Sequence, residues 1–172
     1  MRARFYEPTD GGVFYLTAAD DPEPLIHRPE SHHDGAMPSG AAVAVEGLIR
    51  LGYVRADAEA LAIAERYLER RLVSGALGPL GAARLLGALD LFLHAQCVVV
   101  TDGAGADDLR AAARAAYAPT RLLVGPWAAA AVLADKPAAA RARAYVCRGP
   151  VCALPVEEPA ALAAALAAAP ID

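Results

Sequence analysis

Two cysteines near the C-terminus form one pattern that could carry chemistry. Cys147 and Cys152 stand with four residues between them, at the end of an expected strand. A redox dithiol usually has two intervening residues, and a zinc site needs two further ligands, of which only His94 suggests itself. The alternative interpretation is a pair of small packing residues beside a Gly-Pro turn. Cys97 lies in an apolar strand and is expected in the core, and an odd cysteine number favours reduced thiols over a disulfide framework.

A second group of polar side chains lies on a long N-terminal loop. His32, His33 and Asp34 are consecutive, so the two imidazoles point in opposite directions along an extended chain and rarely bind one metal ion. His33 and Asp34 could form a general acid/base pair, although no nucleophile accompanies them. The alternative is a solvated loop. Ser39 lacks a Gly-x-Ser-x-Gly context because Met37 replaces the first glycine, so we expect it to accept a backbone N–H at a helix start.

Asp90 and His94 lie one helical turn apart on a strongly apolar segment, together with Arg84. Burying a charge is costly unless it is paired, so these residues either line a polar cavity or form a buried structural pair. The structural pair is the commoner case. Asp90 therefore joins His33 and Asp34 as a catalytic candidate.

A glycine-containing turn follows the first apolar strand of the C-terminal half. Its Gly103-x-Gly105 pattern resembles a dinucleotide fingerprint without the third glycine. Asp102, Asp107 and Asp108 surround the expected helix start, where they would repel a phosphate. The pattern therefore predicts an acid-capped turn, and we expect no cofactor and no metal site.

The amino-acid composition argues against several classes of protein. The chain has 172 residues, 16 Lys plus Arg, 20 Asp plus Glu and a formal net charge of −4, and 44 residues are alanine. The apolar content argues against disorder, and the acidic balance argues against a nucleic-acid partner. No apolar stretch reaches the ~20 residues that a membrane span needs. Glu7 and Asp10 interrupt any signal-like N-terminus, so we expect a cytoplasmic protein with no membrane partner.

The hydrophobic pattern predicts two parts, residues 1–95 and residues 96–172. In the first, turn-forming residues precede a short strand over 13–17 and helices over 40–51, 57–73 and 79–94. Gly52 is expected to end the first helix, and Asp57 to cap the second. The third helix is apolar nearly all round, so other elements must enclose it, and few are available.

Strands and helices alternate in the second part. We expect strands over 97–101, 121–124 and 143–147 and helices over 107–117, 127–134 and 157–168. Right-handed crossovers would join these strands into a three-stranded parallel sheet with helices packed on it. The fold class is therefore a mixture of α+β and α/β, with a helical N-terminal part and a small α/β C-terminal part.

Two separated segments resemble one known family. They are Leu25-Ile-His-Arg-Pro29 with Asp34-Gly-Ala-Met-Pro-Ser-Gly40, and Ala144-Tyr-Val-Cys-Arg-Gly-Pro-Val-Cys152 followed by Pro155. In type and order they look like the C-terminal portion of the thioredoxin-domain-containing, spermatogenesis-associated protein family. The resemblance implies the end of an α/α toroid, similar to that of N-acylglucosamine 2-epimerases and other six-hairpin sugar enzymes, followed by a small α/β unit, with no thioredoxin domain in this chain.

The resemblance also suggests positions for a ligand. Arg28, Asp34 and Ser39 lie in the matched N-terminal segment and are ligand-binding candidates. Ala41 stands where the family pattern usually has Asn after Pro-Ser-Gly, so an amide that could contact a ligand is missing. Because most of a toroid is missing too, we expect the apolar surface of the 79–94 helix to be covered by a second copy or by a separately encoded toroid or thioredoxin partner.

Three functions are compatible with these patterns. The first is an interaction or structural module, without activity of its own, that acts as an oligomer or with a partner. The second is a sugar epimerase or isomerase that binds a small carbohydrate and uses His33, Asp34 or Asp90 as acid/base groups. The third is thiol redox chemistry through Cys147 and Cys152, which requires their Cα atoms to lie within ~7 Å.

Overall fold

The computed structural model describes residues 1–23, 25–73, 78–115, 117–126, 131–149 and 151–167. The chain divides into two compact units, which we describe separately. Unit 1 comprises Met1–Gly52 and Ala58–Phe92, and unit 2 comprises Tyr53–Asp57 and Leu93–Asp172. Helices and two sheets occur together in the described residues, which confirms the expected mixed helix and sheet class.

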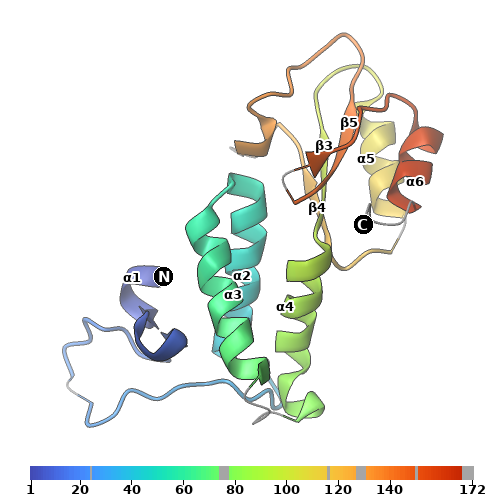
Figure 1. Ribbon diagram of the computed structural model, residues 1–172. Helices are drawn as coiled ribbons and strands as arrows, with labels where there is room; N and C mark the ends of the chain where they lie inside the picture. The colour runs from blue at the N-terminus through green and yellow to red at the C-terminus, as the bar shows by residue number, and fades with distance from the viewer. Residues whose placement is uncertain (24, 74–77, 116, 127–130, 150, 168–172) are drawn as a thin grey trace. The chain divides into compact units, whose positions relative to one another are not determined.

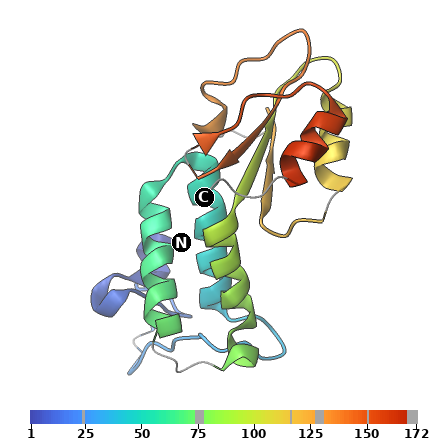
Figure 2. The ribbon, with the colours of Figure 1, turned by 45° about the vertical axis from the view of Figure 1, so that its right-hand side comes forward.

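Unit 1 is mainly helical. Its elements are α1 (Arg2–Phe5), β1 (Tyr6–Glu7), η1 (Thr9–Gly11), β2 (Val13–Phe14), α2 (Gly40–Arg55), α3 (Ala58–Val73), η2 (Pro79–Ala82) and α4 (Ala83–His94), the ends of α2 and α4 belonging to unit 2. The short strands β1 and β2 pair antiparallel. In both ribbon views α2 lies beside α3 and α4 (Figures 1 and 2).

Apolar side chains at helical spacing build the core of unit 1. Leu48 and Ile49 of α2, Tyr67 and Leu68 of α3, and Leu85 of α4 are all at most 3% exposed. Phe14 of β2 packs edge-on against Tyr67, with ring centroids 5.4 Å apart, and so joins the N-terminal strands to this core.

The first long helix extends further than its sequence predicts. Gly52 does not end α2, which continues to Arg55. A glycine inside a helix costs about 1 kcal/mol relative to alanine, and the packing of this buried position outweighs that cost. Ala56, with φ of 53°, supplies the left-handed residue at the helix end instead.

Unit 2 contains a four-stranded mixed sheet. Its strands are β3 (Gln96–Val100), β4 (Arg121–Val124), β5 (Ala144–Arg148) and β6 (Val151–Cys152), in the order β4-β3-β5-β6. Strand β3 runs parallel to β4 and antiparallel to β5, and β5 runs antiparallel to β6. The remaining elements are α5 (Ala106–Ala115), η3 (Ala131–Leu133) and α6 (Pro159–Ala167).

The predicted three-stranded parallel sheet is therefore wrong. A parallel third strand requires the chain to cross back over the sheet after β4, as α5 does between β3 and β4. The described part of residues 125–143 contains only the short η3 turn, and residues 127–130 of the predicted 127–134 helix lie outside the described ranges. Strand β5 consequently starts beside the end of β3, where Thr101 N donates to Arg143 O at 2.9 Å.

The two faces of this sheet are occupied differently. Helices α5 and α6 lie on the same face (Figures 1 and 2), where Val98, Val100, Val146, Leu109 and Leu162 form a buried cluster. Side chains alternate along a strand, so the opposite face carries the odd-numbered residues of β3 and β5. The three cysteines of the chain belong to that opposite face, as the register below shows.

Candidate functional site

Helix α4 is covered on one side only. Leu85, Ala88 and Leu91 are at most 2% exposed, whereas Leu86 is 40% and Leu93 61% exposed. Ala83 and Gly87 are exposed too, and a Cβ built on Gly87 would meet no atom within 4 Å. Leu93 belongs to unit 2, so we call the unit 1 residues Ala83, Leu86 and Gly87 the α4 face. The described residues of unit 1 thus leave apolar surface of this helix uncovered.

The catalytic candidate Asp34 is bonded to two helix starts. Its Oδ1 accepts the N–H of Ser39 at 2.8 Å, before α2, and its Oδ2 accepts the N–H of Arg84 at 2.6 Å, in the first turn of α4. Burial raises the pKa of this carboxyl, but the backbone donors at Ser39 and Arg84 outweigh burial and lower it overall. A carboxylate held in this way stays ionised and joins two helices.

The other loop candidates also contact their own unit. Ser39 Oγ accepts the N–H of Ala42 at 3.2 Å, which is the helix-start role predicted for it. Arg28 stacks on the ring of Tyr15 at 4.1 Å and donates to Thr17 O at 2.8 Å. Both ligand-binding candidates therefore support the backbone around the loop.

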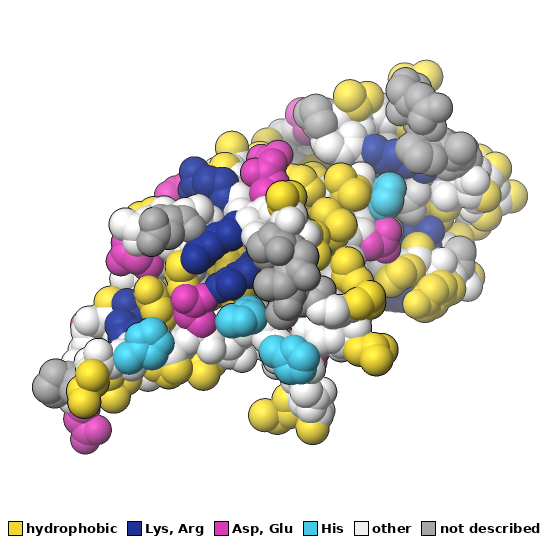
Figure 3. All heavy atoms as spheres, turned by 60° about the horizontal axis from the view of Figure 1, so that its bottom comes forward, with side chains coloured by type: hydrophobic (Ala, Val, Ile, Leu, Met, Phe, Trp, Pro, Cys, Tyr) yellow, Lys and Arg dark blue, Asp and Glu magenta, His cyan; other side chains and the backbone are white. Residues whose placement is uncertain are grey.

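His32 and His33 have different surroundings, as expected for neighbouring side chains on an extended chain. The ring of His33 packs against Gly81, because a Cβ built there would lie 2.3 Å from the imidazole. Nδ1 of His32 is buried and has no hydrogen-bond partner among the described residues. Figure 3 views the molecule from the end at which these loops lie and shows histidine side chains on its surface.

Asp90 does not lie beside Asp34. Asp34 contacts α4 at Arg84, and Asp90 is six residues further along that helix, a rise of about 9 Å. Asp90 and His94 are exposed, so the expectation that they form a buried pair is wrong, although His94 lines the cavity of unit 2 described below. The structure places the acid/base candidates of the sugar-enzyme hypothesis in one unit, yet it brings no two carboxylates among them together.

The cysteines form the closest grouping of reactive side chains in unit 2. Cys147 of β5 and Cys152 of β6 are register partners, joined by a disulfide with Cα atoms 3.9 Å apart. The expected pair of reduced thiols is thus not what the structure contains. Cys97 of β3 is the register partner of Cys147 on its other side. Directly opposed residues share a face, so all three sulfurs lie in one row across three strands.

Burial separates the three members of this cysteine row. Cys97 is 6% and Cys147 2% exposed, whereas Cys152 is exposed on the edge strand β6. Burial raises the pKa of the Cys97 thiol to about 11, and the nearby Lys136 ammonium opposes this only in part. Lys136, itself buried, lies over the ring of Tyr145 at 5.5 Å. The free thiol is therefore protonated at neutral pH and shielded from solvent.

A cavity of about 1230 Å³ lies in unit 2, on the α5 and α6 side of the sheet. Its walls are mainly apolar, with Ala112, Val146 and Leu166 among them. Gln96 lies between its register partners Arg121 and Arg148 at this end of the sheet. Gln96 Oε1 accepts Arg121 Nε at 2.9 Å, so part of this polar row holds the strands and α5 together. None of the catalytic candidates lines this cavity.

The glycine turn after β3 is shaped by close backbone packing. A Cβ on Gly103, whose φ is 144°, would lie 2.5 Å from Ala139 O and Ala142 N. Arg110 pairs with Asp102 and Asp107 at the start of α5. These contacts explain why the turn contains Gly103, Asp102 and Asp107 without invoking a bound phosphate.

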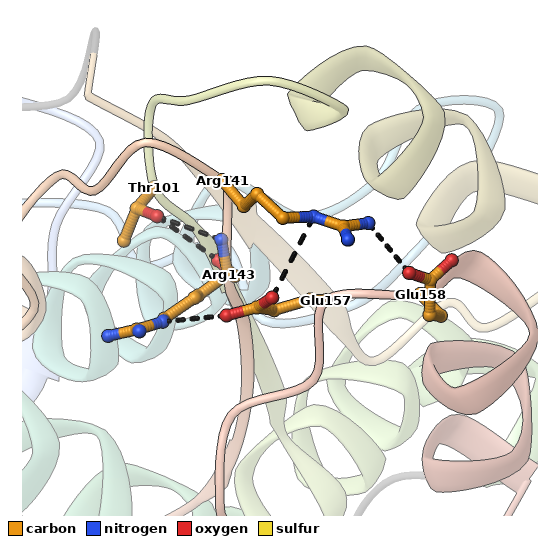
Figure 4. A network of polar contacts seen from close by, with 5 residues as sticks. All are labelled: Thr101, Arg141, Arg143, Glu157 and Glu158. Carbon is orange, nitrogen blue, oxygen red and sulfur yellow. Dashed lines mark hydrogen bonds and ion pairs between the residues drawn. The ribbon is translucent and has the colours of Figure 1, made fainter.

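A network of hydrogen bonds and ion pairs lies at the end of the sheet where β3 ends and β5 begins (Figure 4). Arg143 N donates to Thr101 Oγ1 at 3.0 Å, and its guanidinium pairs with Glu157 at 3.1 Å. Arg141 pairs with Glu158 at 2.7 Å. The hydrogen bonds and ion pairs in the figure join the end of β3, the start of β5 and the start of α6.

Two features of unit 2 were not predicted from the sequence. Strand β6 has only two residues, both exposed, so it carries no hydrophobic alternation. The alignment of Cys97 with Cys147 depends on β5 running antiparallel, which no local pattern indicates. The spacing of Cys147 and Cys152 around Gly149-Pro150 was the available signal for a hairpin.

Two comparisons with known proteins found no relative of the chain. No protein-family model matches the chain, and no curated protein matches it. No helix in the described part of the chain combines the length and apolar character needed to cross a membrane. Within the ranges given above, no three His, Cys, Asp or Glu side chains come together in a way that could hold a metal ion.

Proposed function

We propose that this chain is an interaction module that self-associates through the α4 face. The carrying observation is that Leu86 is 40% exposed in unit 1, on a helix whose opposite side is buried at Leu85, Ala88 and Leu91. Burying apolar surface contributes about 25 cal/mol per Å², so water-exposed leucines on a rigid helix favour association.

Shape favours a second copy of α4 as the occupant of this face. Charge makes no such argument, because the Arg84 guanidinium already pairs with Glu46 of α2. The small residues Ala83 and Gly87 allow the two helices to approach closely. Such an isologous contact closes into a dimer and does not propagate into a fibre.

The experiment compares the mass in solution of three proteins by light scattering. Wild type is expected to be dimeric, and Leu86→Glu to be monomeric because a carboxylate is placed in the contact. Leu154→Glu is the matched control, since Leu154 is an 89% exposed leucine of unit 2 outside the α4 face, and it should remain dimeric. A monomeric wild type, or equal masses for all three proteins, would contradict the proposal.

A second candidate function is reversible thiol–disulfide chemistry at Cys147 and Cys152. The specific observation is their 3.9 Å Cα separation, within the ~7 Å that this function requires, together with the exposure of Cys152. An external thiolate can reach an exposed sulfur, which is the first step of exchange. Thiol titration with and without reductant tests it: reduction should raise the count from one free thiol to three.

We also propose membership in the thioredoxin-domain-containing, spermatogenesis-associated family as its C-terminal portion. Support comes from the two sequence motifs, which occur in the family's order. Sugar epimerase or isomerase activity remains a prediction of that resemblance. No observation in unit 1 favours it, since Asp34 is bonded to two backbone amides.

A further inference from the structure

The register of the sheet places a free thiol directly beside a disulfide. Cys97 pairs with Cys147 across β3 and β5, and Cys147 pairs with Cys152 across β5 and β6. Cys147 is therefore the central sulfur, with a possible partner on either side. The second candidate function uses only two of these residues.

Both pairings have a Cα separation below the ~7 Å beyond which a disulfide cannot form. The Cα atoms of Cys147 and Cys152 lie 3.9 Å apart. Thr101 N bonds Arg143 O, and such hydrogen-bonded pairs recur at every second residue of an antiparallel ladder, which makes Cys97 and Cys147 another. Their Cα atoms are therefore about 5.5 Å apart, inside the usual disulfide range. Cys97 and Cys152 are two strands apart, a separation of about 9.6 Å that no disulfide spans.

We propose that the cysteine row is an internal disulfide relay in which Cys97 exchanges with the Cys147–Cys152 bond. It rests on the second candidate function, because the starting state is that disulfide. The Cys97 thiolate attacks Sγ of Cys147, the Cys147–Cys152 bond breaks, and its electron pair leaves on Cys152 as a thiolate. One disulfide is consumed and one is formed, so no external oxidant or reductant is required.

The burial of Cys97 favours the starting state of the relay, in which the Cys147–Cys152 disulfide is intact. Cys97 is 6% exposed and its pKa is raised to about 11 by burial, so few molecules carry the attacking thiolate at neutral pH. Lys136 is the charged group that favours the thiolate, and its ammonium also pairs with Asp135 and faces the ring of Tyr145. Exchange converts a buried thiol into an exposed one on β6, where a partner can react with it.

The chain is well suited to a direct readout of the exchange. Trypsin cleaves after Arg84, Arg110, Arg143 and Arg148 and so places the three cysteines on separate peptides, 85–110, 144–148 and 149–172. Oxidised wild type is incubated at pH 9, its free thiols are alkylated, and the protein is then denatured and digested. The relay predicts label on peptide 149–172 as well as on 85–110. Label confined to 85–110 would overturn it.

Two variants separate the relay from the disulfide on which it rests. Each is reduced and then exposed to oxidised glutathione, which takes up two electrons and two protons as it becomes two molecules of reduced glutathione. Cys152→Ser retains Cys97 and Cys147, and the relay predicts a fall from two free thiols to none, with peptides 85–110 and 144–148 linked. Cys97→Ala tests only the Cys147–Cys152 bond and should lose both thiols too.

The outcomes of the two variants are distinguishable. If Cys97→Ala loses its thiols while Cys152→Ser carries glutathione on Cys147 without a 97–147 link, the relay is wrong and the second candidate function stands. If Cys97→Ala forms no disulfide, the second candidate function itself fails and the relay with it. The wild-type labelling needs no substitution, so the relay remains testable if either variant misfolds.

Discussion

Asp34 shows how a residue that suggests catalysis can have a structural task. Its two carboxylate oxygens accept N–H groups of Ser39 and Arg84, which stand 45 residues apart in the sequence. A local reading of His33-Asp34 suggests a proton-transfer pair, because nothing near position 34 reveals that Arg84 returns to it. The contact between Asp34 and Ser39 could be predicted from the sequence because it is local. The contact between Asp34 and Arg84 could not, because it depends on how the chain folds back.

Removing the Asp34 carboxylate is expected to destabilise unit 1. Asp34→Ala leaves two helix-start N–H groups without their acceptor and should cost about 1–2 kcal/mol of unfolding free energy at pH 7. Asp34→Asn should cost less, because its amide oxygen still accepts one bond. Urea denaturation measures both. Asp21→Ala, on the same loop, removes one exposed local hydrogen bond and should change stability by less than about 0.5 kcal/mol.

The Asp34 contribution also has a defined pH dependence. The folded-state pKa is lowered, so this stabilisation is fully present above the unfolded value of about 3.9 and is lost as pH falls through the folded value. The difference in unfolding free energy between wild type and Asp34→Asn should therefore shrink below about pH 4. A difference that stays constant from pH 7 to pH 2 would show that the charge of Asp34 makes no contribution.

At the scale of elements, the β3–α5 turn depends on Gly103. Gly103→Ala places a methyl group within 2.5 Å of backbone atoms at 139 and 142 and should cost about 3 kcal/mol or more. Gly105→Ala is the matched control: its φ is 84°, but a Cβ there meets nothing within 4 Å, so backbone strain alone costs roughly 1–2 kcal/mol. Thermal unfolding of unit 2 in the two variants measures the difference. Equal destabilisation would mean that the close packing around Gly103 is not maintained.

The β5–β6 hairpin should lose stability when its disulfide is reduced. The bond closes a loop of about six residues, for which the loss of unfolded-chain entropy stabilises the folded state by about 2 kcal/mol. Denaturation of unit 2 with and without reductant measures this. Cys147→Ala is the control, because without the central sulfur no adjacent pair remains, and its stability should not respond to reductant.

Local patterns predicted where most elements lie but not how all of them pair. The strands predicted over 97–101 and 121–124 correspond to β3 and β4, and the helix predicted between them corresponds to α5, because periodicity and capping residues are local. The direction of β5 was not, because it depends on whether residues 125–143 cross the sheet. The cysteine row follows from that direction, so Cys97 could be assigned only to the core.

At the scale of the whole molecule, the apolar character of residues 80–93 predicted a need for cover. The described residues of unit 1 leave Leu86 40% exposed, so they do not supply that cover. The predicted burial of Asp90 and His94 was wrong, because both residues are exposed. The proposed function therefore depends on a second copy of the chain covering the α4 face.

Sedimentation equilibrium of the unmodified chain tests that proposal most directly. Over micromolar to millimolar concentrations we expect a weight-average mass that rises toward twice the 17.7-kDa chain mass and fits one monomer–dimer constant. A single 17.7-kDa species up to the highest concentration would contradict self-association through the α4 face.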